Sequence, residues 1–501
     1  MDKNSNLIII SENDSVAVAL KDLKAGETHK AGIKDIILIN DIPFGHKVAL
    51  KNIDENENII KYGYPIGHAK CPIHEGEHIH THNLKTNLNG VLEYKYSGNN
   101  EDLLTRFSSE KEAYFDGYVR ADGKVGIRNE VWIIPTVGCV NTTAKLLEKT
   151  ANKKYAGKID GVFAYTHNMG CSQLGEDHRT TQNILKGLIN NPNAGAVLVL
   201  SLGCENNNLD SFKPVLGDVD PKRVKFLVTQ DVEDEYEEAM KLLDELVDYA
   251  STMKREKVSA KHLVMGFKCG GSDAFSGITA NALCGRINDT VVAHGGSTLL
   301  TEVPEMFGAE TILMDRTVSE EVFDDTVDLI NNFKGYFTKY NQTIYENPSP
   351  GNKKGGISSL EEKSLGCTQK GGCAPVVGVL GFGETVEKNG LNLLTGPGND
   401  QVSCTNLVAS GAQMVLFTTG RGNPFGSPVP TVKISSNSNL YNRKKHWIDY
   451  NAGKLLEGES FEAVTEDFFN YLLDVASGKI QTRNEEYGYK EISIFRDGVI
   501  L

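Results

Sequence analysis

Histidine is concentrated near the N-terminus of the chain. Seven of the 12 histidines fall within the first 82 residues, and three of them alternate in the run HIHTHN as His78, His80 and His82. A β-strand would place these three imidazoles on one face. Imidazole is a common metal ligand, so we predict a metal site formed by His68, His80 and His82. The alternative is a polar strand face that is turned to water.

Cysteine offers a second set of ligands. Four of the nine cysteines adjoin a glycine just after a predicted strand, namely Cys139, Cys171, Cys204 and Cys269. Thiolate sulfur suits iron and zinc, so the alternative metal site is an iron–sulfur cluster held by Cys171, Cys204 and Cys269. The competing interpretation is that small residues are tolerated at crowded strand ends.

Positive charge gathers in the segment YVRADGKVGIRNE, around a predicted turn at Asp122 and Gly123. Guanidinium groups bind carboxylates through two hydrogen bonds at once. Arg120 and Arg128, together with Arg421 in GRGNPFG, are therefore candidates for binding an anionic substrate. A solvated turn is the alternative for the first two.

The elements that would position these residues alternate between strand and helix from about residue 117 onward. The predicted strands are short apolar runs at 131–136, 161–166, 196–202, 224–230, 263–267, 375–380 and 414–419. The clearest amphipathic helices are predicted at 232–257, 319–337 and 460–478. This pattern is typical of an α/β fold with mostly parallel sheets, in which ligands bind beyond the carboxyl ends of the strands.

The first segment differs, because its apolar runs are short and turn residues interrupt them every 8 to 12 positions, as in an all-β domain. We predict an all-β domain over 1–98, a linker over 99–116 and two Rossmann-like α/β domains over 117–257 and 258–501.

Composition excludes several classes of protein. The net charge of −14 argues against a nucleic-acid or anionic-membrane binder. No apolar stretch reaches the roughly 18 residues of a membrane span, and the N-terminus does not read as a signal peptide. We therefore expect a cytoplasmic protein with reduced thiols. The sequence also contains neither a Walker A motif nor a complete dinucleotide-binding fingerprint, and this disfavours a nucleotide cofactor.

Long motifs carry a resemblance to a known family. The runs GYPIGHA, HIHTHNLKT, GYVRADGKVGIRN, GCSQLGEDH, GCENNN, KCGGSDAFSGITAN and VSCTNLVASGAQMVLFTTGRGNPFG resemble the altronate/galactarate dehydratase family over nearly the whole chain. The segment from SSNSNLYNRKKHWIDYNAG is closer to altronate dehydratases. The N-terminal segment resembles the SAF-type β-clip domain of this family.

The resemblance implies a hydro-lyase that removes water from a sugar acid and depends on Fe(II), with Mn(II) as a substitute. With altronate the product would be 2-dehydro-3-deoxy-gluconate. Galactarate dehydration and sulfolactate cleavage are the alternatives within the family, and a non-catalytic sugar-acid or metal-binding protein is the alternative outside it. We expect a homodimer.

Dehydration needs a base for the proton on C2 and an acid for the departing hydroxyl. His167, at a strand end, is the candidate base, and Lys268 or Asp273 is its candidate acid–base partner.

Overall fold

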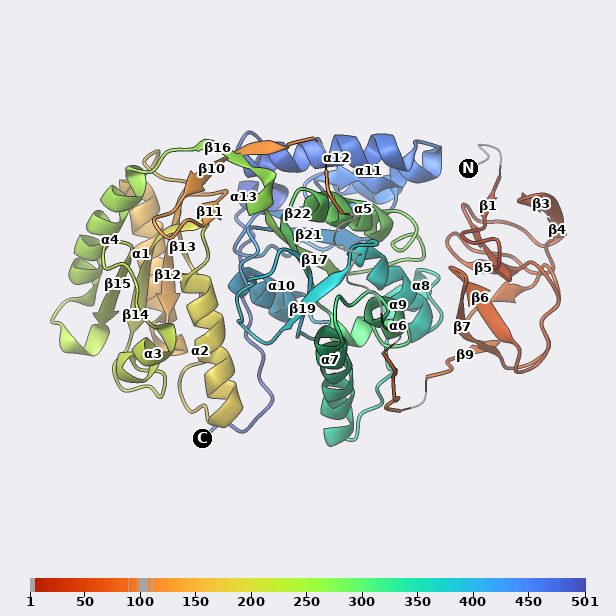
Figure 1. The fold of residues 1–501 in the computed structure, drawn as a ribbon, viewed down its shortest axis with the longest axis horizontal. Coiled ribbons are helices and arrows are strands. Elements are labelled where there is room, and N and C mark those ends of the chain that lie inside the picture. Colours follow the sequence, from red (N-terminus) through yellow and green to blue (C-terminus); the bar gives the residue numbers. More distant parts are fainter. Residues whose placement is uncertain (1–4, 89, 97, 99–106, 110) are drawn as a thin grey trace.

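The computed structural model describes residues 5–88, 90–96, 98, 107–109 and 111–501 (Figure 1). Part of the predicted linker, residues 99–106 and 110, lies outside the described residues. The chain forms an N-terminal β unit, a middle α/β unit and a larger C-terminal α/β unit, and these occupy the right, the left and the centre of Figure 1.

The N-terminal unit consists of antiparallel pairs, as the all-β prediction requires. One sheet has the order β1-β2-β5-β8, a second is the hairpin β3-β4, and a third has the order β6-β7-β9. The strands are β1 (Leu7–Ile8), β2 (Val16–Ala19), β3 (Thr28–Ala31), β4 (Lys34–Ile37), β5 (Lys47–Ala49), β6 (Asn58–Lys61), β7 (Tyr64–Ala69), β8 (His78–Ile79) and β9 (Leu84–Lys85). Its core includes Ile53, Ile59 and Ile66, and it continues into Ala309 and Leu365 of the C-terminal unit.

The middle unit is a parallel sheet of order β13-β12-β14-β15 with helices on both faces. A small antiparallel sheet of order β11-β10-β16 adjoins it. The elements are β10 (Tyr114–Val119), β11 (Val125–Gly126), β12 (Glu130–Pro135), η2 (Gly138–Val140), α1 (Asn141–Lys154), β13 (Val162–Ala164), α2 (Gly175–Ile189), β14 (Ala194–Ser201), α3 (Leu209–Leu216), β15 (Val224–Val228), η3 (Thr229–Asp231), α4 (Glu235–Ser251), β16 (Glu256–Ser259) and η4 (Ala260–His262). Leu147 of α1 and Leu243 of α4 share one apolar core, and Leu185 of α2 and Phe212 of α3 share another.

The C-terminal unit has a seven-stranded parallel sheet of order β19-β20-β18-β17-β21-β22-β23. Its strands are β17 (Val264–Cys269), β18 (Ser297–Leu300), β19 (Val376–Leu380), β20 (Gly390–Leu394), β21 (Met414–Thr419), β22 (Thr431–Ser435) and β23 (Tyr450–Asn451). Its helices are α5 (Ala280–Ala293), η5 (Val303–Glu305), α6 (Glu310–Met314), α7 (Glu320–Lys339), α8 (Pro350–Lys354), α9 (Leu360–Thr368), η6 (Gln369–Gly371), α10 (Asp400–Ala409), α11 (Ser438–Arg443), η7 (Ala452–Glu457), α12 (Phe461–Ala476) and α13 (Arg483–Glu486). None of the described helices is long and apolar enough to cross a membrane.

All seven strands predicted after residue 117 are present, and so are the three predicted helices, as α4, α7 and α12. The predictions missed the antiparallel strands β10, β11 and β16 and the two-residue β23. They also missed β18, β20 and β22. These strands mix polar residues such as Thr298, Asn392 and Lys433 into their buried sequences, and those residues conceal the apolar run that signals a buried parallel strand.

The chain ends on the middle unit. The backbone N–H groups of Asp497 and Gly498 donate to the Asp177 carboxylate, and the N–H of Leu501 donates to the carbonyl of Ser172. The terminus therefore lies at the foot of α2 (Figure 1) and ties the C-terminal segment to the middle unit.

Candidate active site

Polar side chains gather at the carboxyl edge of the seven-stranded sheet, where ligands bind in open α/β folds. Lys268 stands near the end of β17 and is fully buried. Its ammonium lies 3.0 Å from a carboxylate oxygen of Asp400 and also contacts Glu302. Burial alone would lower the pKa of Lys268, but these carboxylates outweigh burial and hold it well above the usual range. Lys268 is therefore a fixed cation inside the protein.

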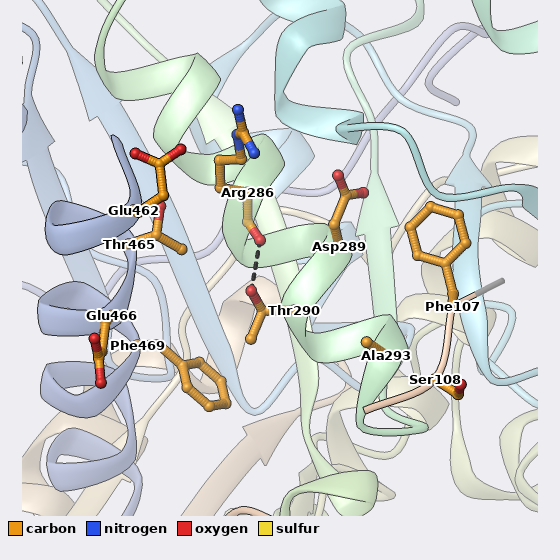
Figure 2. Close-up of a pocket in the computed structure, with 10 residues that line it drawn as sticks. All are labelled: Phe107, Ser108, Arg286, Asp289, Thr290, Ala293, Glu462, Thr465, Glu466 and Phe469. Atoms are coloured by element: carbon orange, nitrogen blue, oxygen red, sulfur yellow. Dashed lines mark hydrogen bonds between the residues drawn. The ribbon is translucent and has the colours of Figure 1, made fainter. Parts of the chain in front are cut away.

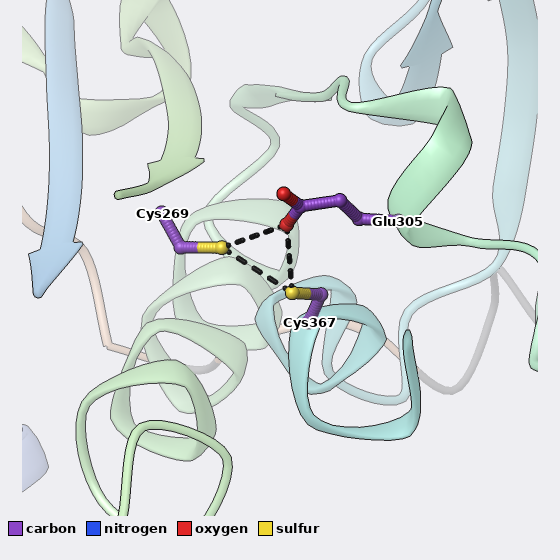
Figure 3. Close-up of side chains that lie close together, drawn as sticks. All are labelled: Cys269, Glu305 and Cys367. Carbon is purple, nitrogen blue, oxygen red and sulfur yellow. Dashed lines mark hydrogen bonds between the residues drawn. The ribbon is translucent and has the colours of Figure 1, made fainter. Parts of the chain in front are cut away.

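Cys269, the residue after Lys268, meets Glu305 and Cys367 (Figure 3). The two sulfurs lie 3.3 Å apart, and each lies about 3 Å from Oε2 of Glu305, at 3.1 Å for Cys269 and 3.0 Å for Cys367. The hydrogen bond between the thiols lowers the pKa of Cys269 to about 5 and raises that of Cys367. Among the described residues, this is the one group of three candidate ligands whose atoms all lie within 4.8 Å of one another.

Lysine ammonium groups already balance the negative charge of Glu305 and of the neighbouring Glu302. Lys363 lies 3.2 Å from Oε2 of Glu305, and Lys370 lies 2.8 Å from Oε2 of Glu302. All of these side chains are almost completely buried. The cationic neighbours and the tight packing make the Cys–Glu–Cys group a poor match for Fe(II) or Mn(II), and Mn(II) in particular prefers oxygen and nitrogen ligands.

Asp273, on the loop after β17, lies at the same edge. Its carboxylate accepts hydrogen bonds from Ser436 at 2.8 Å, Ser276 at 2.9 Å and Asn437 at 3.1 Å. Burial raises the pKa of Asp273 despite these donors. A small cavity lined by Tyr62, Asp273 and Lys363 lies next to it.

Arg421 follows β21, and its backbone N–H donates to the carbonyl of Gly271 in the Asp273 loop. Its guanidinium is exposed and has one long contact, 3.4 Å, to the carbonyl of Gly351. Of the three predicted arginines, only Arg421 both lies at this sheet edge and has an exposed guanidinium.

The imidazole rings of His46, His78 and His80 gather on the N-terminal unit. Nδ1 of His46 lies 2.9 Å from Nε2 of His78, and the His46 and His80 ring centroids are 4.7 Å apart. The His82 ring lies 5.4 Å from that of His78. Burial is the main cause that lowers the pKa of His78 to about 3 and of His80 to about 4, so both imidazoles are neutral.

The imidazole cluster borders the sheet edge through the short segment 354–356. Nε2 of His46 lies 3.5 Å from the carbonyl oxygen of Lys354. The carbonyl of Gly355 in turn accepts the backbone N–H of Ala274, next to Asp273. His46 of the N-terminal unit and the residue that follows Asp273 therefore contact the same short segment.

The donor chemistry of the imidazole cluster fits a divalent metal. Neutral imidazole binds Fe(II) and Mn(II). Nδ1 of His80 is buried without a hydrogen-bond partner, a costly state that a bound ion would relieve. The rings are arranged more loosely than the Cys–Glu–Cys atoms, but the Lys47 ammonium beside them is already paired with Glu362. We therefore favour the nitrogen donors of the imidazole cluster as the site for these ions.

The predicted strand over HIHTHN is wrong beyond Ile79. The amide oxygen of Asn83 accepts the His80 N–H at 3.0 Å, and its amide nitrogen donates to the carbonyl of His78 at 3.0 Å. These two bonds fold 80–83 into a turn, so the strand ends after two residues. His68 lies on β7, where Nδ1 pairs with Oδ1 of Asn87 at 2.7 Å, and the structure does not bring it into the imidazole cluster.

Arg120 and Arg128 lie at the joint between the units rather than at the sheet edge. The Arg120 guanidinium donates to Pro192 O, Asn129 Oδ1 and Arg128 O at 2.7 to 2.8 Å. The Arg128 guanidinium grips both carboxylate oxygens of Glu485, at 2.6 and 3.0 Å. Both are buried and saturated by protein acceptors, so the solvated turn predicted as the alternative is also wrong for these side chains.

His167 lies in the middle unit, between β13 and α2. Its Nε2 donates to the carbonyl of Pro135 at 2.8 Å, and its Nδ1 accepts the N–H of Met169 at 3.1 Å. Burial lowers its pKa to about 4. Both nitrogens are thus used to hold the loop that follows β13.

Cys171 and Cys204 share a sheet edge with each other but not with Cys269. The first two follow β13 and β14 of the middle sheet and are exposed, whereas Cys269 ends β17 of the C-terminal sheet and is buried. The predicted trio of Cys171, Cys204 and Cys269 is therefore wrong as a set, because the α/β region forms two sheets.

A separate hollow of about 520 Å³ lies between α5 and α12 (Figure 2). One cation, Arg286, faces three acids there, Asp289, Glu462 and Glu466. The excess of negative charge disfavours an anionic ligand at this place.

Several residues of the two candidate sites were not predicted from the sequence. They are His46 in the imidazole cluster and, at the sheet edge, Glu302, Glu305, Lys363 and Cys367, and they lie in segments without a distinctive motif. Every residue of helix α9, LEEKSLGCT, is buried although three are charged. Buried charges need partners, and Glu362 and Lys363 of this helix pair with Lys47 and Glu305, contacts that residue spacing does not reveal.

Comparisons with known proteins agree with this architecture. Residues 5–87 match the model "Altronate/galactarate dehydratase SAF domain", residues 117–251 match "D-galactarate dehydratase/Altronate hydrolase, second domain", and residues 260–500 match "D-galactarate/Altronate dehydratase, C-terminal".

The relatives are similar over their full length. The chain is 52% identical to an altronate dehydratase of Bacillus subtilis, covering 99% of this chain and all of that protein. It is 49% identical to an altronate dehydratase of Escherichia coli, covering 97% and 98%. It is 34% identical to the galactarate dehydratase (L-threo-forming) of Escherichia coli, covering 97% and 96%. With three domain models matched in order and full-length relatives well above 30% identity, the chain belongs to the altronate/galactarate dehydratase family.

Proposed function

We propose that this chain is a hydro-lyase that converts altronate to 2-dehydro-3-deoxy-gluconate. The substrate is supported by the two relatives named altronate dehydratase, which are more similar to this chain than the galactarate enzyme is. The observation that carries the active site is the juxtaposition of the His46, His78 and His80 imidazoles with the Asp273 loop across segment 354–356.

The reaction removes a weakly acidic proton from C2 and expels the C3 hydroxyl. Negative charge develops on the substrate carboxylate and the adjacent oxygen as the proton leaves. When bound by His46, His78 and His80, Fe(II) or Mn(II) supplies Lewis-acid stabilisation of that charge.

Two residues of the sheet edge are candidates for proton transfer and for binding the substrate carboxylate. Asp273 is our candidate acid–base residue, because Ser276, Ser436 and Asn437 fix its orientation while burial keeps its pKa raised. Arg421 is our candidate for gripping the substrate carboxylate, because its guanidinium is exposed and lies beside the Asp273 loop.

Lys268 is proposed as a positioning residue. Its ammonium also donates to the carbonyl of Gly398 at 3.0 Å and of Cys269 at 2.9 Å, and so it joins the loops after β17 and β20. His82 borders the imidazole cluster and is a secondary ligand candidate. We further propose a homodimer that acts in the cytoplasm, which size measurement by light scattering and cell fractionation would test.

The deciding experiment is anaerobic turnover with added Fe(II), in which altronate, galactarate and sulfolactate are offered side by side. We expect a 2-keto-3-deoxy acid from altronate, and its loss upon chelation. Product from galactarate alone would overturn the substrate while keeping the reaction. Turnover that survives exhaustive chelation would overturn the metal site.

A further inference from the structure

The middle unit carries three exposed thiols that the proposed dehydration does not use. Cys139, Cys171 and Cys204 follow strands β12, β13 and β14. These strands are direct neighbours in one parallel sheet, with β12 in the middle of the three. All three thiols therefore lie at the carboxyl edge of that sheet, where such folds place their ligands.

Backbone hydrogen bonds tie the three cysteine loops together. The N–H of Gly138 donates to the carbonyl of Met169 at 3.0 Å, which joins the first loop to the second. The N–H of Asn207 donates to the carbonyl of Gly170 at 3.0 Å, and the N–H of Ser172 donates to Oδ1 of Asn206 at 2.8 Å, which joins the second loop to the third. The arrangement is thus fixed before any ligand binds.

The glycines before two of the cysteines are required by this arrangement. Gly170 has a φ of +99°, and a Cβ there would lie 2.0 Å from the carbonyl oxygen of Thr136. Gly203 has a φ of +129°, and a Cβ there would lie 2.7 Å from Oε1 of Gln230. A side chain at Gly170 would push the backbone of the neighbouring loop away, and one at Gly203 would be strained because L residues rarely adopt that φ. Glycine therefore keeps Cys171 and Cys204 in place.

The electrostatic surroundings favour thiolate ligands and an anionic group. Helices α1, α2 and α3 begin shortly after Cys139, Cys171 and Cys204, respectively. Their N-termini carry partial positive charge, although Asn208 caps α3 by accepting the N–H of Ser211 at 3.0 Å. The side-chain amide of Gln230 also donates to the Cys204 sulfur at 3.5 Å, a contact of the kind that tunes iron–sulfur centres.

The distances between the sulfurs of Cys139, Cys171 and Cys204 distinguish an iron–sulfur cluster from a site for a single metal ion. Three thiolates around one zinc, with bonds of about 2.3 Å, would lie about 3.8 Å apart. Among the described residues, only Cys269, Glu305 and Cys367 place three such atoms within 4.8 Å of one another, so the three exposed sulfurs do not all lie that close together. Cysteines that ligate a cubane bind different irons, and their sulfurs are accordingly farther apart.

We propose that Cys139, Cys171 and Cys204 ligate three irons of a [4Fe–4S] cluster on the middle unit. The fourth iron would then carry a non-protein ligand, such as solvent or an oxygen of a hydroxy acid. This site is separate from the imidazole cluster and from the Cys269–Cys367 pair, so it neither needs nor replaces the proposed dehydration site.

The test is anaerobic reconstitution of the full chain with Fe(II), sulfide and a thiol reductant. We expect about four irons and four acid-labile sulfides per chain, broad visible charge-transfer absorption, and an electron paramagnetic resonance signal after reduction. Bound zinc without sulfide, or iron without sulfide, would overturn the proposal.

Single variants locate the ligands. C139S, C171S and C204S should each lose the labile sulfide and the visible absorption, whereas C71S, which removes an exposed thiol of the N-terminal unit, should keep both. H80A should also keep the cluster, which separates failure of this proposal from failure of the dehydration site. A cluster that persists in all three cysteine variants would exclude these ligands.

Alkylation keeps the test independent of variant folding. In the reconstituted wild-type protein, Cys139, Cys171 and Cys204 should be protected from iodoacetamide, while exposed Cys71 and Cys373 react. Removal of iron by chelation under reducing conditions should restore labelling of all three. Equal labelling of all five thiols before and after reconstitution would contradict the proposal.

Discussion

Lys47 on β5 of the N-terminal unit donates its ammonium to the carboxylate of Glu362 on α9 at 2.8 Å, and both side chains are completely buried. Lys61 shares the same carboxylate at 2.6 Å. Burial lowers the pKa of Lys47 to about 8, while the two ammonium groups hold the pKa of Glu362 well below its usual range. This ion triad docks the imidazole cluster onto the helix that carries Lys363 and Cys367.

Removal of the shared carboxylate should loosen this docking. Glu362→Gln leaves two buried ammonium groups without their counter-charge, and breaking such a pair costs about 3–5 kcal/mol. Urea unfolding followed by circular dichroism would measure the loss. The control is Glu57→Gln, whose partner Lys51 is exposed, and it should leave the unfolding free energy nearly unchanged. Equal effects of the two variants would contradict this account.

The depressed pKa of the Glu362 carboxyl predicts that the protein loses stability at acidic pH. Because the folded pKa of Glu362 is depressed, its contribution is complete above the ordinary value of 4.5 and is lost as the pH falls below it. We expect the urea midpoint of the wild-type protein to fall more steeply than that of Glu362→Gln as the pH drops below about 4.5. Parallel curves for the two proteins would show that other groups dominate.

Loss of one imidazole should weaken metal binding strongly without unfolding the N-terminal unit. His80→Ala removes a predicted ligand, so its effect on Mn(II) affinity should exceed the roughly 10–100-fold typical of outer-shell changes. His68→Ala is the matched control, because His68 pairs with Asn87 outside the imidazole cluster. Mn(II) titration by electron paramagnetic resonance gives the affinity, and altronate turnover should fall with it. Unchanged affinity in His80→Ala would remove the imidazole cluster as the metal site.

The arginines should separate into binding and structural roles. Arg421→Ala should raise the KM for altronate about 10–100-fold, as expected for loss of a charge-assisted hydrogen bond of about 1.5–3 kcal/mol. Arg128→Ala should instead lower the free energy of unfolding by about 3–5 kcal/mol with KM unchanged, because it leaves the Glu485 carboxylate buried and unpaired. Steady-state kinetics and urea unfolding of both variants would check this, and a raised KM in Arg128→Ala alone would reverse the assignment.

Local sequence patterns were sufficient to predict the fold class of each unit. Short apolar runs separated by amphipathic segments predicted β12, β13, β14, β15, β17, β19 and β21, since burial on both faces requires continuous apolar residues. The same signal missed β18 and β20, whose apolar runs contain polar residues. Frequent turns fixed the β character of the N-terminal unit. Long motifs identified the family, and glycine–cysteine pairs after strands marked loops that do carry chemistry-bearing side chains.

Tertiary structure alone decided which of these side chains meet. Cys139, and not Cys269, joins Cys171 and Cys204, because the sheet to which a strand belongs depends on long-range pairing. His46 precedes β5 and joins His78 and His80 although it lies 32 residues before His78 in the sequence. Asn83 ends the strand that would have aligned His82. Arg128 forms a buried ion pair with Glu485, which lies 357 residues further along the chain. Spacing along a chain determines local periodicity, whereas the partner of a buried charge is determined by packing between distant segments.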